Sequence, residues 1–391
     1  MGPSSRARMA NRHGVERRAL PARARPRGGV KRAFRVHGAL GMTFGAALFV
    51  ICASGALAAV SSDVDWLVHP ALRAPALADG APRASWGALH ASARAHAPDA
   101  RVIVLAAPLE PGFAAEAIVA RPDDTLARIW LDPRDARVRG EGPYLTVQRF
   151  ARDLHRSLFL GENVGVFVVA LFGLALLGST ASGVLVVWRS RSRRLLRVAK
   201  ERASKDLHRV GGLALVAFAL LAGITGTWYG VERVAAWADV ELTPAAPSID
   251  EAGRARATSE PIADLDTLVA LGRAAMPELE VRAIAMPTER RPVLSLLGET
   301  DALLARDQAN QVFLDPGARV VLGVWRADAM PPIERWVHTV DALHFGSFGG
   351  LPTRALWSAM AIGTALLALS GAWIRARRSA RSSIEAQGGA A

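Results

Sequence analysis

Four histidines stand where this sequence of 391 residues enters, or is about to enter, a long apolar stretch: His37, His155, His208 and His344. A neutral imidazole is a common metal ligand, and two imidazoles that face each other across a helix bundle can bind haem iron from both sides. A histidine at the end of a membrane helix can also be an ordinary interfacial residue. The spacing of the four histidines is the evidence that distinguishes metal ligands from interfacial residues.

A hydroxyl–glycine motif lies at the opposite end of each apolar stretch, at a regular distance from the histidine. The four motifs are Ser54-Gly55, Ser182-Gly183, Thr225-Gly226 and Ser370-Gly371. The offset from histidine to hydroxyl is 17 positions in the first and third stretches, and 27 and 26 positions in the second and fourth. Small residues let membrane helices pack closely, which accounts for the motifs but not for the agreement of the offsets in pairs.

The apolar stretches predict four membrane-spanning helices. They cover residues 34–60, 164–188, 210–229 and 355–374, in a chain that is 51% hydrophobic. Each stretch has about 20 residues or more and almost no charge, which is enough to cross about 30 Å of hydrocarbon. With the flanking motifs included, the predicted spans are 34–60, 155–188, 207–230 and 353–374.

Basic residues crowd one side of the predicted spans. Residues 1–36 carry eleven Lys or Arg and one acidic residue, residues 188–209 carry nine and two, and residues 375–391 carry four and one. In a bacterial inner membrane, this positive-inside pattern predicts a cytoplasmic arm (1–33), loop (189–206) and tail (375–391), and it puts segments 61–154 and 231–343 on the outer, periplasmic side. The net charge of +13 then indicates contact with anionic lipids of the bilayer and no nucleic acid partner.

The first span could instead be a cleaved signal peptide, because the sequence GALAA before Val60 resembles a cleavage site. Its apolar region is longer than a typical signal core and takes part in the repeat of histidine and hydroxyl, which favours a retained helix. Cys52 is the only cysteine of the chain, so both periplasmic segments must fold without an intramolecular disulfide.

Each periplasmic segment predicts a small α+β domain. Helices are expected at 86–97 and 262–276, and strands at 101–107, 116–121, 281–285 and 292–297. The sequences ARIWLDPRDARVRGE (127–141) and NQVFLDPGARVVLGV (310–324) predict β-hairpins that turn at Asp-Pro. The expected fold is therefore a four-transmembrane-helix bundle with two periplasmic α+β domains, internally duplicated.

This topology sorts the histidines into two pairs. His37 and His208 are expected near the cytoplasmic face, and His155 and His344 near the outer face, each pair providing the axial ligands of one haem. Four neighbouring arginines are expected to meet the haem propionates: Arg35, Arg209, Arg152 and Arg156. A Cys-x-x-Cys-His motif is absent, which excludes covalent c-type haem and leaves two b-type haems. His338, six residues before His344, is an alternative ligand.

These motifs resemble the PepSY-associated transmembrane-helix family, which includes iron-regulated membrane proteins and inner-membrane ferric-siderophore reductases. The resemblance lies in FRVHGALG (34–41), DLHRSLFLG (153–161), SGVLVVW (182–188), DLHRVGGL (206–213), ALHFGSFGGLP (342–352) and SGAWI (370–374). It implies four spans, two PepSY-like outer domains, haem b held by these same histidines, and electron delivery to periplasmic ferric siderophores.

The sequence therefore predicts a haem-b electron-transfer protein that reduces a ferric siderophore, or another ferric chelate, and so releases its iron. The cytoplasmic parts are too short for a flavin domain, so quinol or a separate cytoplasmic reductase is expected to donate the electrons. No catalytic residue is identified beyond the expected haem ligands. The alternative function is a cofactor-free membrane protein that regulates a peptidase or serves a siderophore transporter as an accessory subunit.

Overall fold

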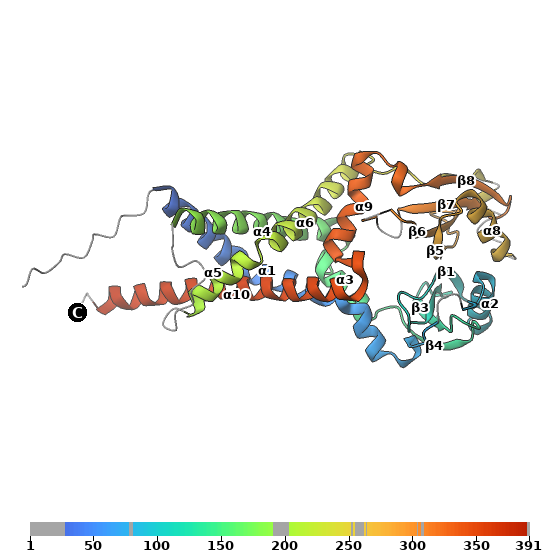
Figure 1. The fold of residues 1–391 in the computed structure, drawn as a ribbon, viewed down its shortest axis with the longest axis horizontal. Helices are drawn as coiled ribbons and strands as arrows, with labels where there is room; N and C mark the ends of the chain where they lie inside the picture. The colour runs from blue at the N-terminus through green and yellow to red at the C-terminus, as the bar shows by residue number, and fades with distance from the viewer. Residues whose placement is uncertain are drawn as a thin grey trace, which may run out of the picture.

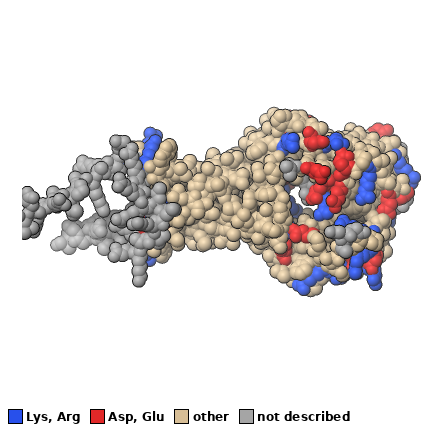
Figure 2. All heavy atoms as spheres, in the orientation of Figure 1, with Lys and Arg blue, Asp and Glu red and all other residues tan. Residues whose placement is uncertain are grey.

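The protein consists of a bundle of long helices and a β-sheet domain at one end of the bundle (Figure 1). The structure, a computed structural model, describes residues 28–77, 81–190, 203–251, 253–254, 262, 264–302, 304–305 and 309–388. Most of the predicted cytoplasmic arm and most of the predicted loop at 189–206 lie outside the described residues. Figure 2 shows charged side chains concentrated on the sheet domain and sparse on the visible surface of the bundle.

Four long helices and one short helix, α5, form the bundle in the described part of the chain. They are α1 (Gly28–Val68), α4 (Glu162–Ser190), α5 (Ala203–Ala214), α6 (Val216–Trp237) and α10 (Gly350–Gly388). Three stretches, Lys31–Val68, Glu162–Arg189 and Ser347–Arg377, are long and apolar enough to cross a membrane, and α5 with α6 forms a fourth if the pair is one span. The prediction of a membrane protein is confirmed at this level.

The third predicted span is broken into two helices. Helix α5 ends at Ala214, α6 begins at Val216, and the two are bent by 63° at the break. Gly211 and Gly212 lie in the last turn of α5, where small residues favour a kink. The bend places α5 against α10, a contact on which the position of His208 depends.

The second and fourth predicted spans are each preceded by a separate short helix. These helices are α3 (Val147–Ser157) before α4, and α9 (Pro332–Phe345), followed by the short helix η4 (Ser347–Gly349), before α10. Glycines in the left-handed region turn the chain after each of them, Gly161 with φ 81° and Gly346 with φ 66°. His155 and His344 therefore lie on α3 and α9, outside the membrane-spanning stretches.

The two extramembrane segments share one antiparallel sheet. Its strands are β1 (Arg101–Ala106), β2 (Ala115–Ala120), β3 (Leu126–Leu131), β4 (Val138–Pro143), β5 (Glu280–Ala285), β6 (Leu294–Glu299), β7 (Asn310–Asp315) and β8 (Val320–Trp325), in the order β4-β3-β2-β1-β5-β6-β7-β8. The sequence predicted a separate α+β domain in each segment, but β1 pairs with β5 and joins the two halves. The two predicted Asp-Pro hairpins are present as β3–β4 and β7–β8.

Two helices cover one face of this sheet and bury its main core. Helices α2 (Trp86–His96) and α8 (Leu265–Ala275) pack with side chains such as Leu105, Ile129 and Leu296, which are almost fully buried. Asp266 of α8 also accepts hydrogen bonds from Ser85 Oγ at 2.6 Å and from the Gly87 amide at 2.8 Å, which ties α8 to the first turn of α2. On the opposite face, among the described residues, the short helix η1 (Pro70–Leu72) packs against Trp130 of β3, and neither α2 nor α8 covers β1 and β5.

Candidate functional site: two histidine pairs

The four predicted histidines come together as two pairs at the two ends of the bundle. His37 of α1 and His208 of α5 have ring centroids 6.1 Å apart, and they form the sheet-distal pair. His155 of α3 and His344 of α9 have ring centroids 5.9 Å apart, and they form the sheet-proximal pair. Each pair joins a histidine from the first half of the chain to one from the second half, as the sequence predicted.

Each imidazole is fixed through its Nδ1 atom. His37 Nδ1 donates to the carbonyl oxygen of Ser179 at 2.9 Å, and His155 Nδ1 donates to that of Ile51 at 2.8 Å. His208 Nδ1 lies 2.9 Å from Ser370 Oγ, and His344 Nδ1 lies 2.7 Å from Thr225 Oγ1.

The proton of each imidazole is therefore on Nδ1. The hydroxyls of Ser370 and Thr225 donate their own protons to backbone carbonyls at 2.9 and 2.7 Å, so their oxygens accept from the imidazoles. A carbonyl oxygen can only accept, so His37 and His155 must donate in the same way. The lone pair of each imidazole then lies on Nε2, the atom available to a metal.

Each imidazole packs against one hydroxyl–glycine motif, which we call the seat of that imidazole. Every motif contacts a histidine that belongs to a different helix: Ser54-Gly55 of α1 holds His155, Ser182-Gly183 of α4 holds His37, Thr225-Gly226 of α6 holds His344, and Ser370-Gly371 of α10 holds His208. A Cβ on the four glycines would lie 2.7 to 3.6 Å from the Cε1 atom of the ring. Gly55, Gly183 and Gly371 thus leave room that the rings occupy, whereas a Cβ at Gly226 would make an ordinary contact.

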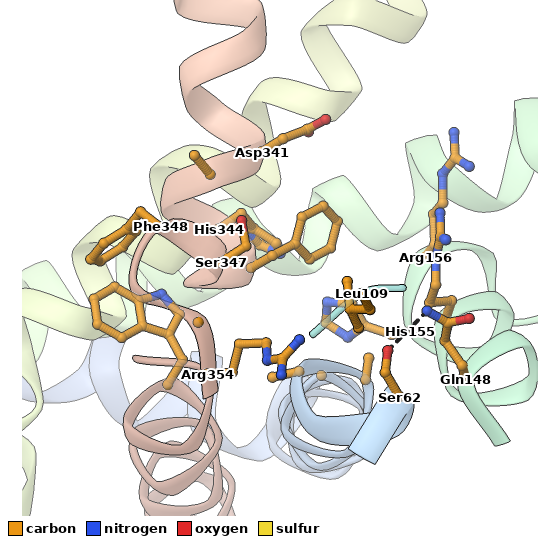
Figure 3. A pocket seen from close by; sticks show the side chains of 18 of the residues that line it. Ser62, Leu109, Gln148, His155, Arg156, Asp341, His344, Ser347, Phe348 and Arg354 are labelled. Atoms are coloured by element: carbon orange, nitrogen blue, oxygen red, sulfur yellow. Dashed lines mark hydrogen bonds between the residues drawn. The ribbon is translucent and has the colours of Figure 1, made fainter. Parts of the chain in front are cut away.

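A large cavity adjoins the sheet-proximal pair. Its volume is about 1670 Å³, and it extends from the apolar interior between the helices to the open face of the sheet. Figure 3 shows His155 and His344 reaching this space from different helices, with Arg354 of α10 extending toward them. Apolar side chains including Leu48, Phe172 and Phe218 line the part inside the bundle.

The sequence did not predict Arg354, the most buried arginine beside this pair. Its guanidinium donates to Glu110 Oε1 at 2.6 Å and to Asp63 Oδ1 at 3.3 Å, while its buried Nε atom has no hydrogen-bond partner among the described residues. A charged side chain at the start of a predicted apolar span was the signal that could have identified it.

The four arginines predicted to meet propionates have different surroundings. Arg152 and Arg156 line the cavity, but Arg156 pairs with Glu162 at 2.6 Å and extends away from the histidines (Figure 3). Arg209 pairs with Asp206 at 3.1 Å, and Arg35 is exposed. Arg152 is the one of the four that lines the cavity and that no ion pair with a described residue engages.

The region that contains both histidine pairs matches the model of a known protein family. A family model described as the PepSY-associated TM region matches residues 34–378. The chain belongs to this family. The matched range includes all four histidines and all four hydroxyl–glycine motifs. No curated protein matches the chain.

In this PepSY-associated chain, the other described histidines are not part of either pair. His338 is buried on α9, but it does not line the cavity, whereas His344 does. His69 lies beside Asp65 and Trp130, and His96 is 3.1 Å from Glu141 Oε2 in the sheet domain. The geometry therefore favours His344 over His338 as the partner of His155.

The environment of the sheet-proximal pair keeps both imidazoles neutral. Burial lowers the pKa of His344 to about 3, with a smaller contribution from the nearby His155. Burial also lowers the pKa of His155. A neutral imidazole is the form that ligates a metal, so no proton has to be removed at neutral pH.

Asp65 anchors the helix that carries His155. Its buried carboxylate, at the end of α1, accepts hydrogen bonds from the amides of Val147 at 2.8 Å and Gln148 at 3.0 Å, the first two residues of α3. Charged acceptors stabilise the free amides and positive end of a helix N-terminus. Helix α1 thus holds α3 both at its start and at His155.

Replacing this anchor is expected to destabilise the protein. Asp65→Ala leaves two amides of α3 without their acceptor, so we expect a loss of about 1–2 kcal/mol and a lower Tm in detergent, measured by tryptophan fluorescence. Asp65→Asn retains one acceptor oxygen and should lose less. Equal Tm values for the wild type and both variants would show that Asp65 is not an anchor.

Proposed function

We propose that this member of the PepSY-associated TM region family is an inner-membrane electron-transfer protein that binds two b-type haems. The sheet-distal pair would hold one haem through His37 and His208, and the sheet-proximal pair would hold the other through His155 and His344. The basic segments would lie in the cytoplasm and the sheet domain in the periplasm, as the positive-inside pattern indicates.

The spacing of the paired rings is the observation that carries this proposal. Two imidazoles on opposite sides of one iron, each with a metal–nitrogen bond of about 2.0 Å, hold their ring centroids roughly 6 Å apart. The observed distances are 6.1 and 5.9 Å, and every Nδ1 is engaged so that Nε2 is left for the iron. Each pair provides two nitrogen ligands, the number that a porphyrin-bound iron lacks.

The surroundings of the sheet-proximal pair also suit a porphyrin. An apolar cavity adjoins the rings, and it is lined by Arg354, whose buried Nε atom has no hydrogen-bond partner among the described residues. Arg152 provides a second guanidinium one turn before His155. Arg152 and Arg354 are therefore the residues expected to meet the propionates, in place of Arg156.

The separation of the two pairs fits electron transfer between them. His37 and Ser54 both lie on α1, 17 positions apart, and Ser54 contacts His155 of the other pair. At 1.5 Å per residue, the two levels are about 25 Å apart along the helix. After subtraction of the macrocycles, we expect an edge-to-edge gap of roughly 10 Å, short enough for tunnelling.

The expected reaction is the one-electron reduction of iron(III) to iron(II) in a chelate that docks at the sheet domain, such as a ferric siderophore. Iron(II) is held less tightly by hard oxygen ligands, so reduction would release it. Haem supplies the redox centres when it is bound, and a quinol or a cytoplasmic reductase would supply the electrons.

The absorption spectrum of the purified protein tests the proposal directly. We expect a Soret band and split visible bands of low-spin haem after reduction with dithionite, and reoxidation by ferric chelates in a stopped-flow measurement. Colourless protein from haem-replete cells would instead support a cofactor-free role, such as regulation of a peptidase or service to a transporter.

A further inference from the structure

The open face of the sheet has a groove over the joint between the two halves. One cross-strand row of side chains, contributed by six neighbouring strands, lines the cavity along its whole length: Trp130, Glu116, Ala106, Ala283, Leu297 and Gln311. The two smallest side chains of the row, Ala106 and Ala283, lie at its centre on β1 and β5. Larger side chains on both sides make the centre the floor of a groove.

The cavity is larger than one cofactor site requires. Ordinary ligand pockets have volumes of about 300–1,000 Å³. The volume here is about 1670 Å³, and its lining runs from the sheet-proximal histidines to this groove. A small molecule on the groove would therefore share one space with the sheet-proximal pair.

Three carboxylates around this groove each lie close to an arginine. Glu116 pairs with Arg128 at 2.7 Å, and Glu110 pairs with Arg354 at 2.6 Å. Glu299 lies 3.8 Å from Arg282. Asp301 is the exposed carboxylate of the lining that no contact with a described residue engages.

Arg291 lines the cavity without such a carboxylate partner among the described residues. It lies in the turn between β5 and β6, and its guanidinium is half-buried. Burial lowers the pKa of Arg291, but a guanidinium stays charged at neutral pH. A positive charge that is partly removed from water, and that lacks a carboxylate, favours an anionic ligand.

We propose that this groove is an anion-selective chelate site, in which Ala106 and Ala283 form the floor and Arg291 contacts negative oxygens of the bound chelate. This site deepens the proposed function, on which it rests, because it assigns the docking place and the charge of the iron(III) complex. The bound chelate would lie in the same cavity as the sheet-proximal pair, where one electron would reduce its iron(III) to iron(II).

Binding of a redox-inert chelate tests the site without haem chemistry. Gallium(III)–EDTA is an anion of suitable size, and its affinity for the full chain can be measured by calorimetry in detergent. Arg291→Glu reverses the charge and Ala283→Trp fills the floor, so each should weaken binding at least about tenfold. Arg290→Glu changes the adjacent arginine, which is exposed and outside the cavity lining, and should change affinity less than about twofold.

Equal affinities of the Arg291→Glu and Arg290→Glu variants, or no binding to the wild type, would overturn the site. Normal reoxidation by iron(III)–EDTA in both glutamate variants would also overturn the site and leave the proposed reductase intact. Conversely, selective loss of gallium–chelate binding in a protein without a Soret band would support the site and reject the haem-based function.

Discussion

His155→Ala is expected to remove about half of the bound haem and to leave the remaining half with an unchanged low-spin spectrum. The variant takes one of the two nitrogen ligands from the sheet-proximal pair, whose ring centroids are 5.9 Å apart. The sheet-distal pair lies at the other end of the bundle, about 25 Å away along α1, so its ligands are unaffected. Haem content per chain, measured by the pyridine haemochrome assay, gives the result.

Double variants distinguish two independent sites from general unfolding. His155→Ala with His344→Ala changes both members of one pair, so it should lose no more haem than either single variant. His37→Ala with His155→Ala changes both pairs and should lose nearly all haem. Full haem retention in each single variant would reject the ligand assignment, and loss of all haem in one single variant would indicate that the two sites are not independent.

The sequence predicted the two pairs because helix direction and the positions of the histidines together define depth in the membrane. It predicted the hydroxyl–glycine motifs as a repeat, but it could not assign them a role. An offset of 17 positions between His37 and Ser54 measures distance along one helix, whereas Ser54 contacts His155 of another helix. Such a contact depends on how the helices pack, which no spacing within one helix encodes.

Interactions between distant segments account for most of what the sequence left out. Strand β1 was recognised from its apolar run, but its pairing with β5 joins segments about 180 residues apart and depends on the bundle that holds them together. The break at Leu215 has no proline to mark it. The sequence does not reveal the roles of Asp65 and Arg354, because their hydrogen-bond partners lie on other elements of the fold.

The two halves of the chain hold their histidine rings in different ways. The Nδ1 atoms of His37 and His155, from the first half, lie nearer to a backbone carbonyl than to the hydroxyl of the motif, whereas those of His208 and His344 lie 2.9 and 2.7 Å from the hydroxyl. The seats differ in tightness as well, since a Cβ would lie 2.7 Å from the His155 ring at Gly55 but 3.6 Å from the His344 ring at Gly226. This difference allows two matched substitutions at the sheet-proximal pair, Gly55→Ala and Gly226→Ala.

Gly55→Ala is expected to weaken haem binding at the sheet-proximal pair by roughly 10- to 100-fold. The added methyl group crowds the expected ligand His155, and such overpacking costs about 1–3 kcal/mol. The new methyl group would lie 2.7 Å from Cε1 and 3.0 Å from Nδ1 of His155. The ring cannot move away without lengthening its 2.8 Å hydrogen bond to Ile51, which belongs to the same helix as Gly55. Haem titration of the purified variant, followed in the Soret band, measures the effect.

Gly226→Ala is the control, because it makes the same change in the seat of the partner ring. Its methyl group would lie 3.6 Å from Cε1 of His344, an ordinary contact distance, so we expect less than about a twofold change in affinity. Both variants replace a helical glycine and gain similar helix propensity, about 1 kcal/mol, so this contribution cancels in the comparison. Equal affinities of the two variants would mean that the ring of His155 does not occupy the seat at Gly55 when haem is bound, and the ligand assignment at this pair would then fail.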